Sequence, residues 1–157
     1  MLHFWPAMDV PLPPRLFSLP EASSLLRELR RQFTRARELR GELVELQAQL
    51  QRFGRSLEGP DLKVDPHAPA EVRELQRKAV RHIVELRDIL GEVAELGVEV
   101  KAADGLVDFR SRLHGRTVYL CWKFPEDRIT HWHELDAGYA GRKPLPAGAD
   151  FVGDFLH

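Results

Sequence analysis

Histidine and carboxylate side chains gather in the run His131-Trp132-His133-Glu134-Leu135-Asp136. Residues two apart in a strand share a face, so His131 and His133 are expected to point the same way and to be able to bind one metal ion. Glu134 or Asp136 would complete a set of two histidines and a carboxylate, which is a ligand set of open, catalytic metal sites. The run therefore predicts a site for a divalent transition metal at His131, His133, Glu134 and Asp136.

The strand that precedes this run determines what the two histidines face. A two-residue hairpin at Glu126-Asp127 would put Trp122 opposite His131 and Leu120 opposite His133, on an apolar and partly desolvated face. A loop longer by one residue would reverse that register. The alternative to a metal site is that the histidines hydrogen-bond to backbone or carboxylate groups and pack against the tryptophans.

Arginines are concentrated in the first helical segment, at positions 27, 30, 31, 35, 37 and 40. Such a cluster can bind phosphate groups, with aromatic side chains as a stacking platform for bases: Tyr119, Trp122 and Trp132. The segment expected to face these arginines is acidic, with Glu85, Asp88, Glu92 and Glu95. The arginines are therefore expected to find partners within the fold, and nucleic acid is not the expected partner.

Two further features have simple structural explanations. The run Gly138-Tyr139-Ala140-Gly141-Arg142 could present backbone donors and a guanidinium to an anion, although turn geometry alone accounts for the glycines. Cys121 is the only cysteine, which excludes an internal disulfide and a multi-cysteine metal site and fits a reducing cytoplasm. It is expected to be a small buried apolar group on a strand.

Two helical patterns dominate the first part of the chain. Ser18 and Glu21 form a capping-box signature, and an apolar stripe at spacings of three and four continues from there to Gly54. A second stripe begins beyond a linker broken by prolines and ends at Gly97. Two similar stripes with a short connection predict a long antiparallel helical hairpin of the coiled-coil type over residues 18–97.

After Gly97 the apolar period changes to two, which is typical of strands. Residues 98–134 predict a small antiparallel sheet of three or four strands, with turns at Asp104-Gly105 and His114-Gly115. Glycines and prolines then indicate an irregular tail over residues 135–157. The predicted fold class is α+β, with a long antiparallel two-helix hairpin, a small antiparallel sheet and an irregular C-terminal tail.

Size and charge restrict the remaining possibilities. A chain of 157 residues is sized for one domain, expected here over residues 17–157, and four early prolines predict an extended arm over residues 1–16. Basic and acidic side chains number 23 and 24, which gives no reason to expect an acidic membrane or nucleic acid. No apolar run approaches the length of a bilayer span. We therefore expect a cytoplasmic protein.

A resemblance to a known family is carried by three segments, LFSLPEASSLL, GLVDFRSRLHGRTVYLCWKFPE and HWHELDAGYAGRKPL. They resemble the uncharacterised prokaryotic proteins grouped as domain of unknown function 2203, over residues from Phe17 to Leu145. The resemblance implies a small cytoplasmic protein of no established activity. It also implies that the positions to watch are those matching the family's signature block: Asp108, Trp122, Trp132, His133, Gly138, Gly141 and Arg142.

Two classes of function are compatible with these patterns, and the sequence leaves open whether the protein is an enzyme. The first is a non-enzymatic protein-interaction or self-assembly module. In it, a C2 dimer would form a four-helix bundle and bury the remaining apolar positions Leu25, Val44, Val80, Ile83 and Leu90. The second is a metal- or anion-binding protein, with hydrolase-like activity as one form of it, built on His131, His133, Glu134, Asp136 and Arg142.

Overall fold

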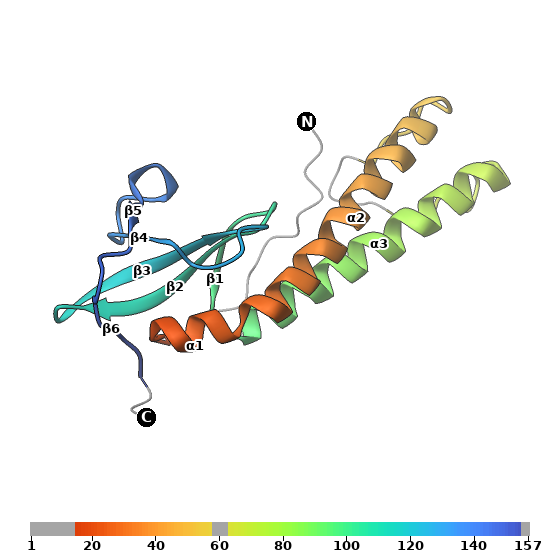
Figure 1. Cartoon of the computed structure of the whole chain (residues 1–157). Helices are drawn as coiled ribbons and strands as arrows, with labels where there is room; N and C mark the ends of the chain where they lie inside the picture. The colour runs from red at the N-terminus through yellow and green to blue at the C-terminus, as the bar shows by residue number, and fades with distance from the viewer. Residues whose placement is uncertain (1–14, 58–62, 155–157) are drawn as a thin grey trace. The chain divides into compact units, whose positions relative to one another are not determined.

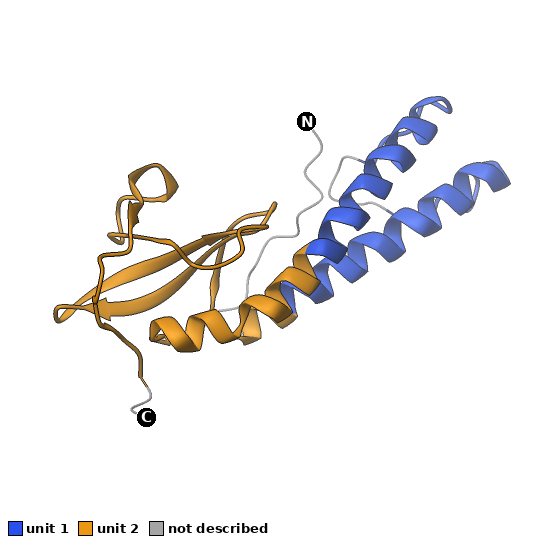
Figure 2. Cartoon of the chain, viewed as in Figure 1, with its two compact units in different colours: residues 1–8, 34–91 blue, residues 9–33, 92–157 orange. Residues whose placement is uncertain are grey.

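The fold is described from a computed structural model, which covers residues 15–57 and 63–154 (Figure 1). Most of the predicted arm at residues 1–16 lies outside these ranges. The chain forms two compact units (Figure 2). Of the described residues, unit 1 contains residues 34–57 and 63–91, and unit 2 contains residues 15–33 and 92–154. That residues 17–157 form a single domain stays a prediction.

Three helices form the first part of the described chain: α1 (Leu19–Ser24), α2 (Leu26–Gln51) and α3 (Ala70–Glu95). The predicted capping box is confirmed, because Ser18 accepts a hydrogen bond from the Glu21 backbone and the Glu21 side chain accepts one from the Ser18 backbone. The single long first helix predicted from the stripe is in fact divided at Leu25, where a turn separates α1 from α2. The predicted end of the second helix is confirmed, with Gly97 at a φ of 85° that favours glycine.

Polar pairs fix the antiparallel alignment of α2 and α3 in each unit. In unit 1, Arg35 forms an ion pair with Glu85, and the Glu42 carboxylate lies 2.7 Å from His82 Nε2. In unit 2, Gln32 bonds to Glu92. Between the helices lie apolar side chains that are almost fully buried, including Leu39, Leu43, Leu50, Val72, Ala79 and Leu86. The predicted pairing of arginines with acidic residues across the hairpin is confirmed at Arg35.

The other predicted arginine pairs differ in detail. Arg31 forms its ion pair within α2, with Glu28. Arg30 donates to the backbone carbonyls of Glu126 and Asp127, in the loop that joins two strands of the sheet. An arginine expected to pair with the acidic second helix therefore holds a loop of unit 2 instead.

The predicted α+β class is confirmed, and the antiparallel sheet has six strands, two more than the upper estimate. The strands are β1 (Glu99–Ala102), β2 (Leu106–Leu113), β3 (Arg116–Lys123), β4 (His131–His133), β5 (Lys143–Pro144) and β6 (Phe151–Val152). Their order is β1-β2-β3-β4-β5, and β6 pairs with β2. The two added strands and the short helix η1 (Tyr139–Gly141) come from the tail expected to be irregular. They have only two or three residues each, which is too short to leave a periodic pattern.

Alternate residues of the central strands face opposite sides of the sheet. One face carries Phe109 and Trp122, whose rings meet Phe17 and Phe33 at centroid distances of 5.4 and 6.4 Å. The other face carries polar groups, among them Asp108, Cys121 and His133, which are also buried. Unit 2 therefore has an apolar core on one side of the sheet and a polar cluster on the other.

The predicted register between β3 and β4 is wrong by one residue. Cys121 lies opposite His131 and Tyr119 lies opposite His133, so both histidines belong to the polar face. The connection is longer than the two-residue hairpin assumed, because β3 ends at Lys123 and β4 begins at His131. The loop is held by hydrogen bonds to Glu126, whose carbonyl accepts from Trp122 Nε1 and whose carboxylate accepts from the Lys123 backbone.

None of the helices in the described ranges combines the length and the apolar character that a membrane-crossing segment requires.

Candidate functional site

Three potential metal ligands from three adjacent strands meet on the polar face of the sheet. They are Asp108 on β2, Cys121 on β3 and His133 on β4, and their ligand atoms all lie within 4.8 Å of one another. All three residues are buried, with exposed fractions of 2%, 0% and 2%. No other group of this kind occurs among the described residues.

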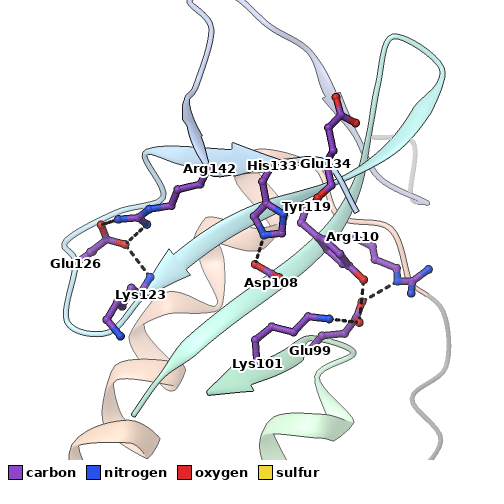
Figure 3. Close-up of polar contacts among 10 residues, drawn as sticks. All are labelled: Glu99, Lys101, Asp108, Arg110, Tyr119, Lys123, Glu126, His133, Glu134 and Arg142. Carbon is purple, nitrogen blue, oxygen red and sulfur yellow. Dashed lines mark hydrogen bonds and ion pairs between the residues drawn. The ribbon is translucent and has the colours of Figure 1, made fainter. Parts of the chain in front are cut away.

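Hydrogen bonds determine which ring nitrogen of His133 is available. His133 Nδ1 lies 2.7 Å from the carbonyl oxygen of Glu134. A carbonyl oxygen can only accept, so Nδ1 carries the proton. His133 Nε2 lies 3.0 Å from Asp108 Oδ1, as Figure 3 shows. A single proton is therefore shared between Nε2 and the Asp108 carboxyl group.

Burial controls the protonation of the other two members of the cluster. Burial raises the pKa of Asp108, although the imidazole of His133 opposes that rise. Burial, reinforced by the Asp108 carboxylate, raises the pKa of Cys121 to about 12. The thiol is therefore neutral at physiological pH and donates a hydrogen bond to the Asp108 carboxylate.

A second polar pair borders the cluster. Arg142 forms two hydrogen bonds to the Glu126 carboxylate, each 3.1 Å long (Figure 3). Its guanidinium also interacts with Cys121. Although burial opposes the effect, Arg142 lowers the pKa of Glu126. The pair places a positive group beside the thiol.

A network around Glu99 borders the cluster on the β1 side. Glu99 accepts hydrogen bonds from Lys101, Arg110 and Tyr119 (Figure 3). These partners lower the pKa of Glu99 against the opposing effect of burial. The Tyr119 ring also lies 5.3 Å from the His133 ring, between centroids, and so helps to cover the imidazole.

The four residues predicted as metal ligands are not brought together. His133 belongs to the cluster, and His131 lies on the same face of β4, where its Nδ1 is 2.8 Å from Thr130 Oγ1. The Glu134 carboxylate instead pairs with Arg116 and points away from Asp108 in Figure 3. Asp136 is exposed.

The signature positions have distinct roles. Trp122 and Trp132 pack on the apolar face, against Phe33 and Phe151. Gly138 has a φ of 65°, which lets the chain turn into η1, and a Cβ atom at Gly141 would lie 2.7 Å from that of Ala137. The two glycines therefore shape the turn that precedes Arg142.

Sequence reasoning missed Cys121 as part of a site, although a signal was present. Both His114 and Gly115 have positive φ, as expected for a two-residue hairpin turn. In a hairpin with this turn, paired residues lie the same number of residues before His114 and after Gly115. Asp108 is therefore opposite Cys121. The turn prediction, extended along the strands, would have paired these two residues.

A model of one protein family matches residues 15–145, and its description is "Uncharacterized conserved protein (DUF2203)". The chain belongs to this family. The match extends from Arg15 to Leu145 and so includes all three members of the cluster, together with Glu126 and Arg142. No curated protein and no solved structure matches this DUF2203 chain.

Proposed function

We propose that this DUF2203 protein binds a divalent transition metal ion, with zinc as the leading candidate, through Asp108, Cys121 and His133. The observation that carries the proposal is the convergence of a carboxylate, a thiol and an imidazole within 4.8 Å in a buried part of the sheet. Tetrahedral zinc requires separations of roughly 3.3 to 3.8 Å between ligand atoms. The three groups therefore need to move only slightly around an ion.

The surroundings of His133 support this role. Metal-binding histidines usually donate their second ring N–H to a carbonyl or carboxylate, which fixes the ring orientation. The bond from Nδ1 to the Glu134 carbonyl has this form and leaves Nε2 directed at the other two ligands. The ring is thus oriented before any ion arrives.

Charge balance also favours a divalent ion. A thiolate and a carboxylate together carry two negative charges, so an ion of charge +2 would leave the buried ligand set neutral. A neutral set avoids the large free-energy cost of an uncompensated charge in a buried place. The cytoplasmic location expected from the single cysteine would keep Cys121 reduced.

The test is titration of the reduced, metal-free chain with Co²⁺, followed by the absorption of the cobalt–thiolate bond, and with Zn²⁺ by calorimetry. We expect one ion per chain, and affinity at least about tenfold lower for Cys121→Ser, Asp108→Asn and His133→Gln. His131→Gln is the matched control and should bind as the wild type does. Absence of the thiolate band in the wild type would remove the proposal.

A second candidate is protein interaction or self-assembly through the helical hairpin. The observation that favours it is that Val44 and Val84 are 54% and 45% exposed on the helices of unit 1. Of the other positions predicted for a dimer, Leu25, Val80 and Ile83 are half-buried, and Leu90 is only 2% exposed. Leu90 is therefore already buried in the core and is not available to a dimer interface. Light scattering, which measures the mass of the protein in solution, tests whether the chain forms a dimer through the other positions.

A further inference from the structure

One edge of the hairpin in unit 1 is apolar. Glu42 and His82 meet at 2.7 Å across the hairpin and mark one edge of the pair. A step of two residues rotates a helix by about 200°. Val44, two residues after Glu42, and Val80, two residues before His82, therefore lie at one level on the opposite edge. Val84 follows Val80 by about one turn and is 45% exposed.

The same edge is basic. Arg40 precedes Val44 by about one turn of α2, and Arg87 follows Val80 by about two turns of α3. Neither arginine forms an ion pair or hydrogen bond with any residue in the described ranges. The nearby carboxylates of Glu42 and Glu85 lie on the other edge, where they pair with His82 and Arg35.

We infer that this basic apolar edge, formed by Arg40, Val44, Val80, Val84 and Arg87, docks an amphipathic helix of another protein that carries acidic residues beside its apolar face. The inference rests on the protein-interaction candidate above and names its partner by chemistry. An apolar stripe at helical spacing would cover the valines, and flanking carboxylates would meet the two arginines.

Charge decides between this partner and the alternatives. A second copy related by a twofold axis would place the same basic edge against itself and bring the arginines close to one another. Like charges at an interface lower affinity. Nucleic acid would satisfy the arginines, but its phosphates would leave Val44 and Val84 without apolar partners. An acidic amphipathic helix satisfies both kinds of side chain.

The test uses a labelled synthetic helical peptide with leucines on one face and glutamates on both flanks, and a peptide of the same composition in scrambled order. Fluorescence anisotropy should show binding of the ordered peptide to the full chain, and at least tenfold weaker binding of the scrambled peptide. Val84→Asp and Arg87→Glu should each weaken binding at least tenfold. Val152→Asp, at a valine 37% exposed in β6, is the control and should leave it unchanged.

The other outcomes would overturn the inference in distinguishable ways. If the ordered peptide does not bind, or if Val84→Asp and Arg87→Glu bind it normally, no acidic helix docks at this edge. A wild-type dimer in light scattering that Val84→Asp converts to monomer would assign the edge to a second copy and leave the interaction candidate standing. Binding of single-stranded RNA that displaces the peptide from the wild type, and that is lost in Arg87→Glu but kept in Val84→Asp, would assign the edge to nucleic acid. Because the metal site is separate, Cys121→Ser should bind the peptide as the wild type does.

Discussion

His133 Nε2 lies 3.0 Å from Asp108 Oδ1, and the other ring nitrogen of the same histidine is committed to the carbonyl of Glu134. One proton is therefore held between two buried side chains that lie 25 residues apart in the sequence, on different strands. An ion that takes Nε2 and the carboxylate as ligands must displace this proton. Cys121 must lose a second one, because its pKa of about 12 keeps the thiol protonated.

Metal binding is accordingly expected to release about two protons per ion at neutral pH. Calorimetry of Zn²⁺ binding in buffers of different ionisation enthalpy measures this number. In Cys121→Ser the thiol proton is no longer available, so release should fall to about one in whatever binding remains. Release of no protons by the wild type would mean that the ion binds elsewhere on the chain.

The buried thiol also predicts a loss of stability at alkaline pH. The unfolded thiol ionises near pH 8.5, whereas burial raises the pKa of folded Cys121 to about 12. Because the pKa of the thiol is higher in the folded state than in the unfolded state, the protonated thiol stabilises the fold. This stabilisation is fully present below the unfolded pKa and is lost as the pH rises from the unfolded pKa towards the folded pKa. Between roughly pH 9 and 12, the wild type should lose up to about 1.4 kcal/mol per pH unit relative to Cys121→Ser.

Urea denaturation of both proteins at pH 7.5, 9 and 10 measures this difference. The serine variant is the internal control, because every other titrating group, including Tyr119, is common to the two chains. Parallel decline of the two proteins over this range would show that the Cys121 thiol is not protected from ionisation by the fold.

The Arg142–Glu126 pair should contribute to stability through the loop that it holds. Glu126→Gln keeps an oxygen to accept from the Lys123 backbone but loses the charge that Arg142 meets with two bonds. We expect a loss of about 1 to 2 kcal/mol in urea denaturation. The matched control is Glu134→Gln, whose partner Arg116 is mostly exposed, with an expected loss below about 1 kcal/mol. Equal losses would mean that burial of the Arg142 pair adds nothing.

Two glycines should respond oppositely to substitution by alanine. Gly105 has a φ of 109°, and a Cβ atom there would lie 2.5 Å from the Cβ atom of Phe124, so Gly105→Ala should cost more than about 1 kcal/mol. Gly41 lies in α2 with nothing within 4 Å of the added atom, and Gly41→Ala should stabilise by roughly 0.5 to 1 kcal/mol. Thermal denaturation measures both, and a stabilising Gly105→Ala would contradict the close approach to Phe124.

The helices and the first strands were predictable because their signals are local. Ser18 with Glu21 and the stripes before Gly54 and Gly97 depend on neighbours within a few residues, and the structure confirms them. The break at Leu25 was not predictable, because the apolar stripe continues across it without interruption.

The candidate site was predictable only in part, for a physical reason. His133 was identified from its spacing, but its partners depend on the register between strands. The β2–β3 register follows from the two-residue turn at His114-Gly115. The β3–β4 register depends on a longer loop stabilised by the Trp122 and Glu126 side chains, and such tertiary contacts leave no periodic signal.

Side chains alternate between the two faces of the sheet along each strand, and this alternation places fluorescent tryptophans close to the proposed metal site. Cys121 and His133 each adjoin a tryptophan in the chain, Trp122 and Trp132, and those indole rings lie on the opposite, apolar side of the same strands. A paramagnetic ion at the cluster would be separated from each fluorophore only by the thickness of the sheet. The emission of the wild-type chain, without any attached dye, should therefore respond when Cu²⁺ or Co²⁺ occupies the polar face.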